Sequence, residues 1–327
     1  MTEKEINSFY SSLARTDGVL RGIFVSHPAE ITKSDCFIFV INRQVLLNDA
    51  GMTGCTDAID RLVRIRGEVN PGGKLGITWI LSHFHVDHVA AAIETLIPDE
   101  RFSFNDVYLP PLSKLDPKYE GNGDTKYRER LADAIARYQP QAKIHHIPFF
   151  TEWEYPDHFD FGGAKVTVYP PERDWSSPEC VDIIVNGYFG GAPGPAKVAT
   201  CVINASSLWF KLSYAGKTIV MTGDSMKREK SITNENFDMM LKVWGRKFRG
   251  ADLFKWPHHG MARDNAAAGV AEIAPSHILT STAIETASKV TKEEFPEFFE
   301  KTVFHNCALS DVYLTVEPNG DMTFYED

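Results

Sequence analysis

The sequence predicts an α/β fold that carries polar, metal-ligating side chains at the edge of a sheet. Residues 76–81 form an apolar run rich in β-branched and aromatic residues, which is typical of a buried strand. Residues 89–96 are mostly good helix formers and predict a helix. The polar turn at 82–88 therefore joins a strand to a helix, and open α/β folds bind ligands at this edge of their sheets.

The turn itself has the pattern H-x-H-x-D-H. It places four potential metal ligands, His83, His85, Asp87 and His88, within six residues. Imidazole suits zinc and iron, and a carboxylate suits a second, harder cation or a bridging position. The alternative is a group of surface histidines on a polar turn, which requires this spacing to arise by chance. The pattern therefore favours a metal centre.

The remaining apolar runs predict strands on both sides of this turn. Before it, we expect a helix at 56–66 and strands at 22–26, 36–42 and 44–48. After it, we expect a hairpin at 311–316 and 322–325, and strands at 106–109, 143–147, 164–169, 207–214, 218–222, 252–255 and 277–280. The second half of the chain thus repeats the strand pattern of the first.

Two segments interrupt the pattern. Residues 112–141 open with a loop and close on an expected helix at 125–138, and residues 170–197 read as one long loop. A loop of this length is usually a lid, a binding loop or disordered, so we predict that both segments cover the site and select the substrate. No linker divides the 327 residues, which predicts a single domain with insertions at about 112–141 and 170–197.

Composition predicts a cytoplasmic protein without a membrane partner. The amino-terminal residues are charged and lack the apolar core of a signal peptide. The longest apolar run, at 36–41, is far too short for a membrane helix. The five cysteines are odd in number and show no C-x-x-C spacing, which fits a reducing compartment.

The charge of the chain argues against strong binding of duplex nucleic acid. The formal net charge is −10, and non-specific DNA binding depends on Lys and Arg at the phosphates. Two bound dications would reverse the sign only locally. The short basic stretch at 242–249 is more often the solvated face of a helix than a nucleic-acid patch.

The H-x-H-x-D-H turn resembles the signature of the metallo-β-lactamase superfamily, and three further motifs occur in that family's order. Residues 45–51 resemble a strand ending in an aspartate, residues 218–224 the strand that delivers a bridging aspartate, and residues 253–260 the strand end that delivers the last histidine. With residues 204–212, they are similar to the hydrolase domain of bacterial competence DNA-uptake channels and its soluble relatives. The resemblance spans about residues 20–320 and implies an αββα sandwich, two mixed β-sheets flanked by helices.

The resemblance also implies two divalent metal ions, which would be zinc, manganese or iron. The implied ligands are His83 and His85 for the first ion, Asp87, His88 and His259 for the second, and Asp224 as a bridge between the two. Many family members supply another histidine from the stretch that here reads 200–207, and this chain has none there. Asn204 or Ser206 would ligate weakly or through water in its place, so a state with one metal ion stays open.

Three more polar residues receive expected roles. Asp49 would accept a hydrogen bond from a ligand imidazole, or would cap a turn before Gly51. If residues 258 and 259 are extended, their side chains point in opposite directions, so His258 would either contact a ligand or donate a proton to the leaving group. Lys255 would steady an anionic substrate or face solvent.

These features together predict a metal-dependent hydrolase. The leading expectation is a phosphodiesterase that uses a metal-bridging hydroxide on a small-molecule or oligonucleotide phosphate ester. Hydrolysis of a lactone, thioester or β-lactam uses the same hydroxide and is the second reading, although those branches tend to supply the missing histidine. A non-hydrolytic redox or sensory module that binds iron is the alternative of another class. The oligomeric state is left open.

Overall fold

The structure is a computed structural model of residues 1–327. It describes residues 1–27, 34–54, 56–111, 115–116, 118–119, 125–150, 157–189, 191, 193–225, 245–260, 267–282, 296–308 and 310–326.

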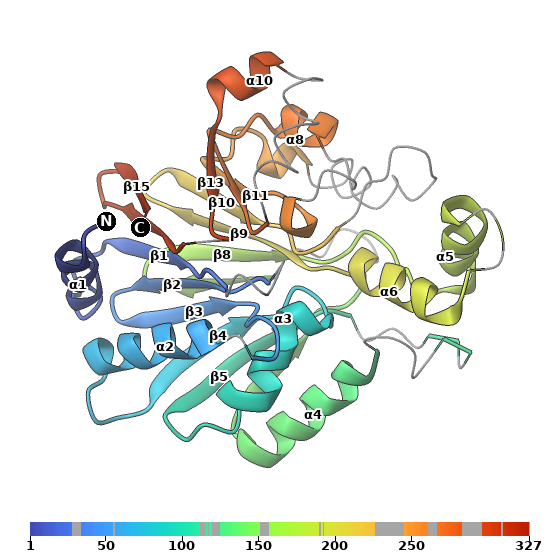
Figure 1. The fold of residues 1–327 in the computed structure, drawn as a ribbon, viewed down its shortest axis with the longest axis horizontal. Helices are drawn as coiled ribbons and strands as arrows, with labels where there is room; N and C mark the ends of the chain where they lie inside the picture. Colours follow the sequence, from blue (N-terminus) through green and yellow to red (C-terminus); the bar gives the residue numbers. More distant parts are fainter. Residues whose placement is uncertain are drawn as a thin grey trace.

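Two mixed β-sheets form the centre of the molecule (Figure 1). The order of the eight-stranded sheet is β15 (Met322–Glu326), β14 (Val312–Val316), β1 (Leu20–Phe24), β2 (Phe37–Ile41), β3 (Gln44–Asn48), β4 (Leu75–Ile80), β5 (Phe102–Leu109) and β6 (Lys143–His146). The order of the seven-stranded sheet is β13 (Val303–Asn306), β12 (His277–Thr280), β11 (Leu253–Lys255), β10 (Lys217–Met221), β9 (Trp209–Tyr214), β8 (Ala164–Tyr169) and β7 (Asp157–Phe161). Each sheet has a parallel half, β3 to β6 in one and β10 to β13 in the other.

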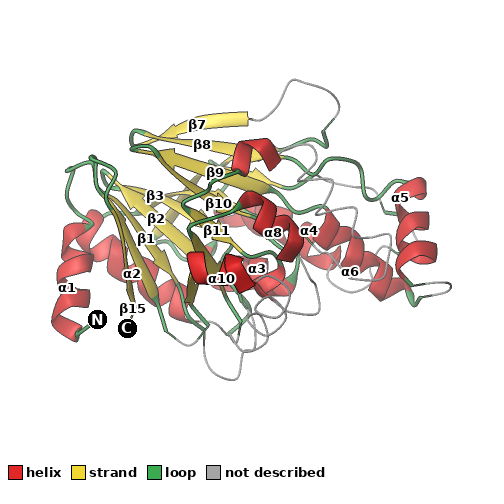
Figure 2. Cartoon of the chain, turned by 90° about the horizontal axis from the view of Figure 1, so that it is seen from above, coloured by secondary structure: helices red, strands yellow, loops and turns green. Residues whose placement is uncertain are grey.

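Helices cover the outer face of each sheet (Figures 1 and 2). The helices of the first sheet are α1 (Glu3–Ser12), α2 (Thr56–Val69), α3 (Val86–Ala91) with its π-helical continuation η1 (Ala92–Leu96), and α4 (Lys126–Tyr138). Those on the side of the second sheet are α8 (Ala267–Ile273) and α10 (Pro296–Lys301). None of the helices in the described ranges is long and apolar enough to cross a bilayer.

Three apolar cores separate these layers, and strand β2 shows how the sequence fills two of them. Ile38 and Val40 pack in the core between the first sheet and its helices, whereas Phe37, Phe39 and Ile41 pack in the core between the two sheets. Successive side chains of a strand point to opposite faces, so a strand buried on both faces is an unbroken apolar run. A third core joins the second sheet to α8 through Val270 and Ile273. The predicted αββα sandwich is therefore confirmed.

The reading of 170–197 as one long loop is wrong. This segment contains the short helix α5 (Pro178–Asp182), the π-helix η3 (Ile183–Tyr188) and the first residues of α6 (Pro195–Ala205). A proline at the first position of a helix is favourable because its missing N–H would have no partner there, and both α5 and α6 begin in this way. Most of the stretch 200–207, where many family members have a histidine, lies in α6.

The two predicted insertions pack against each other. Leu115 and Tyr119, before α4, share an apolar cluster with Trp175, Val181 and Ile184 from the second insertion. The helix α4 itself is part of the main fold, because Leu131 and Ile135 pack in the core under the first sheet. The proposed lid function of these segments stays a prediction, and residues 112–114, 117, 120–124, 190 and 192 lie outside the described residues.

Candidate metal centre

The ends of four parallel strands bring the polar motifs together. Asp49 follows β3 and the turn with His83 follows β4, and these two strands are parallel neighbours. Asp224 follows β10 and His259 follows β11, which are parallel neighbours in the other sheet. The two sheets meet closely here: a Cβ at Gly223, whose φ is 59°, would lie 2.8 Å from the Cβ of Ser82. Glycine therefore permits the approach that places Asp224 beside the histidine turn.

One group of side chains surrounds a position suited to the second predicted ion. The Oδ2 of Asp224 lies 3.3 Å from Nε2 of His88 and 3.2 Å from Nε2 of His259, which in turn lies 3.2 Å from Oδ2 of Asp87. Two ligands on one tetrahedral zinc ion are separated by about 3.3 Å, given metal–ligand bonds of about 2.0–2.1 Å. The Nε2 atoms of His88 and His259 are buried and make no hydrogen bond within the described residues. These donors therefore fit a shared cation.

A second group, His83, His85 and Asp224, fits the first predicted ion. Its ligand atoms lie within 4.8 Å of one another, and those of Asp35, His88, Asp224 and His259 do the same. The Nε2 of His83 lies 3.1 Å from Nδ1 of His85 and 3.7 Å from Oδ2 of Asp224. Asp224 is therefore common to both groups, which is the position of a bridging carboxylate. No cysteine belongs to either group in the described part of the chain.

The backbone at residues 258 and 259 is not extended, which corrects the premise used for His258. Both residues have left-handed backbone angles, with φ of 51° for His258 and 60° for His259. This conformation is uncommon for residues other than glycine and is often found at functional sites. Consequently both rings face the same carboxylate, and Nε2 of His258 lies 3.8 Å from Oδ2 of Asp224. Proton donation by His258 to a leaving group stays a prediction.

Asp49 holds the histidine turn in place. Its Oδ1 accepts a hydrogen bond from the backbone N–H of Ser82 at 2.7 Å. Its Oδ2 accepts from the hydroxyl of Ser82 at 2.8 Å and lies 2.9 Å from Nδ1 of His88. A carboxylate at Nδ1 directs Nε2 toward the metal position, as is usual for metal-binding histidines. The same residue therefore both caps the turn and orients a ligand, so the two readings of Asp49 are compatible.

Asp35 is a site residue that the sequence analysis missed. It lies two residues before β2, and its Oδ1 lies 2.9 Å from Nδ1 of His259, so it orients this histidine as Asp49 orients His88. The hydroxyl of Ser281 donates to the same oxygen. The sequence offers one sign of this role: Asp35 is a charged residue next to the fully apolar strand that begins at Phe37. A carboxylate buried at such a position needs a partner.

Lys255 is buried inside this network and does not face solvent. Its Nζ lies 2.5 Å from Oδ2 of Asp35 and 3.6 Å from Oδ1 of Asp224, and it donates to the carbonyl oxygen of Gly223 at 3.0 Å. Only 1% of Lys255 is exposed. This position indicates that Lys255 holds the carboxylates in place. It is less suited to the predicted contact with an anionic substrate.

The buried carboxylates of the site shift the pKa values of the groups around them. Burial by itself would raise the pKa of Asp35, but the charges of Lys255 and His259 lower it. Burial would lower the pKa of His88, but the Asp224 and Asp49 carboxylates outweigh this and raise it to about 10. The carboxylates of Asp224 and Asp35 likewise raise the pKa of His259, so protons compete with a metal ion for both imidazoles.

The remaining predicted residues lie close to this centre or outside it. Asn204 is buried in the last turn of α6, three residues before Ser207, whose hydroxyl accepts a hydrogen bond from the backbone N–H of Asp224 at 3.2 Å. A role for Asn204 at the first ion stays a prediction. The basic stretch 242–249 lies partly outside the described residues.

Metal stoichiometry tests the assignment of the paired histidines. We expect His259→Ala to lose one of two bound ions, because its Nε2 faces both Asp87 and Asp224. We expect His258→Ala, the matched control next to it in the chain, to retain both ions. Elemental analysis of the purified, metal-saturated variants gives the ratio of metal to protein. Loss of an ion from His258→Ala alone would reverse the assignment.

Solved structures whose fold aligns with that of this chain include the metallo-β-lactamase fold protein YhfI from Bacillus subtilis. Its TM-score is 0.49 at 13% identity, and the alignment covers 94% of this chain and 100% of that one. A diphosphatase of the PhnP family has a TM-score of 0.44 at 11% identity, over 90% of this chain and 96% of that one. The short form of human tRNase Z has a TM-score of 0.39 at 10% identity, over 79% of this chain and 91% of that one. No protein-family model matches the sequence, and no curated protein matches it significantly.

Proposed function

We propose that this chain is a metal-dependent hydrolase of the metallo-β-lactamase superfamily, with two divalent ions and phosphodiesterase activity on small or single-stranded phosphate esters. The observation that carries the proposal is the position of Asp224. Its carboxylate belongs to two adjacent groups of buried ligands, one with His83 and His85 and one with His88 and His259. A carboxylate shared by two such groups can hold two ions close together, as a two-metal mechanism of hydrolysis needs.

When bound, such a pair of ions supplies an activated water and neutralises the charge on the attacked phosphoryl oxygens. The chain's own residues prepare the place for this chemistry. Asp49 and Asp35 fix the rings of His88 and His259 from behind, at 2.9 Å each, so the ligand atoms are positioned before substrate arrives. His258, whose Nε2 is 3.8 Å from Asp224, stands next to the reacting position, where it can give a proton to a departing oxygen.

Phosphoester chemistry is favoured over acyl hydrolysis by the ligand set. The branch of the superfamily that the motifs at 204–212, 218–224 and 253–260 resemble acts on phosphoesters. The lactone and β-lactam branches tend to have the histidine that this chain lacks at 200–207. The net charge of −10 further favours small or single-stranded esters over duplex DNA.

Hydrolysis of a generic diester tests the proposal. We expect protein loaded with manganese or zinc to hydrolyse bis(p-nitrophenyl) phosphate, and chelator-treated protein not to, with p-nitrophenol release as the measurement. Activity should fall as the pH is lowered, because protons then compete with metal for His88, whose metal-free pKa is about 10, and the attacking water is less deprotonated. Lactone or thioester hydrolysis without any diester hydrolysis, under manganese, zinc or iron, would support the second reading instead.

A further inference from the structure

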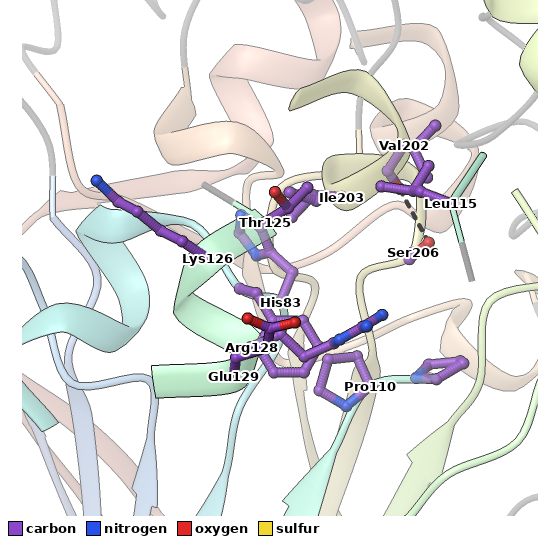
Figure 3. A pocket seen from close by; sticks show the side chains of 12 residues that line it. His83, Pro110, Leu115, Thr125, Lys126, Arg128, Glu129, Val202, Ile203 and Ser206 are labelled. Atoms are coloured by element: carbon purple, nitrogen blue, oxygen red, sulfur yellow. Dashed lines mark hydrogen bonds between the residues drawn. The ribbon is translucent and has the colours of Figure 1, made fainter. Parts of the chain in front are cut away.

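A cavity opens directly beside the metal-binding turn (Figure 3). His83 forms part of its wall, and the neighbouring wall positions are Phe84, Pro110, Leu115, Arg128 and Ile203. Its volume is about 110 Å³. We refer to the space bounded by these residues as the ring cavity.

The ring cavity is built from four segments that are distant in sequence. The turn after β4 supplies both a metal ligand, His83, and an apolar wall residue, Phe84. Pro110 follows β5, Arg128 lies in α4, and Ile203 lies in α6. Leu115 belongs to the first insertion, so this insertion contributes to the wall of the space next to the first ion.

The size and chemistry of the ring cavity define what fits in it. A cavity of about 150 Å³ lined by Leu, Ile and Phe is known to hold one benzene molecule, so a space of similar size has room for one planar ring. The side chain of Phe84 offers an aromatic face, and those of Pro110, Leu115 and Ile203 offer apolar surface. An aromatic ring of a ligand packs favourably against such a face.

A larger hollow continues from the ring cavity. Leu115 and Arg128 line both spaces, and the second has a volume of about 780 Å³. It is more polar in character, with Asp116, Lys118 and Ser176 on its walls. The part of a substrate that lies beyond its ring can therefore leave the ring cavity through this hollow.

We propose that the ring cavity binds one planar aromatic group of the substrate, a nucleobase or a simple aryl group, while the ester phosphate lies at the metal centre. This inference rests on the proposed function and assigns its substrate class, aromatic phosphate esters. Phe84, Leu115 and Ile203 are then specificity residues that select the ring and do not touch the reacting atoms.

Binding of phosphonates that are not hydrolysed tests this proposal without turnover. Calorimetric titration of the manganese-loaded protein with phenylphosphonate and methylphosphonate compares two ligands with the same anionic head, one of which carries a ring. We expect phenylphosphonate to bind at least about tenfold more tightly, the effect of burying one ring. A second pair, uridine 5′-monophosphate and ribose 5-phosphate, distinguishes the two kinds of ring. Tighter binding of the nucleotide than of the sugar phosphate identifies a nucleobase. A preference for phenylphosphonate over methylphosphonate without this difference identifies a simple aryl group.

Variants that fill the cavity locate the effect. Ile203→Phe should remove the preference for phenylphosphonate and leave the affinity for methylphosphonate unchanged, and Leu115→Phe should do the same from another segment if the first variant does not fold. Ala196→Phe adds the same ring to an exposed position of α6 and should keep the preference. Equal affinity for the two phosphonates, no binding of phenylphosphonate, or a preference that survives both filling variants would overturn the proposal. Failure of the proposed function alone would instead appear as intact phenylphosphonate binding without diester hydrolysis.

Discussion

Replacing Asp224 with asparagine is expected to lower diester hydrolysis by about a hundredfold or more, the scale of removing one preorganised electrostatic stabiliser. The amide keeps the shape of the side chain but lacks the charge that both ligand groups share. In the unmodified protein, Oδ2 of Asp224 lies 3.2–3.8 Å from ring nitrogens of His83, His88, His258 and His259, so the substitution removes the charge at the point where the two ligand groups meet. The measurement is the rate of p-nitrophenol release at saturating metal, together with the metal content of the variant.

Asp311→Asn is the matched control for this experiment. Asp311 is also a buried aspartate, but it pairs with Arg61 and accepts hydrogen bonds from Ser26 away from the two ligand groups. We expect the control to lose stability and to retain activity per folded molecule. Asp224→Asn with two bound ions and an unchanged rate would contradict the bridging role.

Sequence alone predicts the part of the site that is local in the chain. His83, His85, Asp87 and His88 are neighbours in one turn, so their spacing is itself the signal. Asp224 and His259 are recognisable only through the motifs around them. Asp35 could not be found in this way, because its role depends on contact with His259, which is 224 positions away. A contact of this kind is created by the packing of the two sheets.

The conformation of the paired histidines shows a second limit. Two consecutive residues with left-handed backbone angles are unfavourable unless the surrounding structure imposes them. No local pattern at 258–259 indicates this conformation. An extended backbone was the default expectation, and it wrongly predicted that the side chain of His258 points away from that of His259. The carbonyl oxygen of Gly223 accepts from the backbone N–H of His258 at 3.2 Å, so the neighbouring strand end helps to fix the turn.

The strands were predictable because a buried strand is an apolar run of characteristic length, and most predicted strands lie within a few residues of the observed ones. The helices between 178 and 205 were not, because α5 and η3 are short and their sequence is rich in β-branched residues. Their stability depends on the apolar cluster that they share with Leu115 and Tyr119. Helices of this kind are stabilised mainly by tertiary packing, which local propensity does not report.

Replacing Lys255 with methionine is expected to destabilise the metal-free protein by about 3–5 kcal/mol, the usual effect of removing one partner of a buried ion pair. Methionine fills a similar volume, so the loss reports charge more than packing. The network around Lys255 contains four nearly inaccessible carboxylates, those of Asp35, Asp49, Asp87 and Asp224. Without the ammonium group, their mutual repulsion increases, and Oδ2 of Asp35 loses the partner that lies 2.5 Å away.

Urea unfolding in the presence of a chelator measures the free energy of unfolding, and Lys217→Met is the matched control. Lys217 is also paired with an aspartate, Asp252, at 3.0 Å, but its side chain is 32% exposed, so the same substitution should cost no more than about 1 kcal/mol. Added manganese should restore part of the stability of Lys255→Met, because bound cations supply positive charge to the same carboxylates, and should change that of Lys217→Met no more than that of the unmodified protein. Equal losses in the two variants would show that Lys255 does not neutralise the site. A large rise in KM for the diester with little loss of stability would instead support direct contact between Lys255 and the anionic substrate.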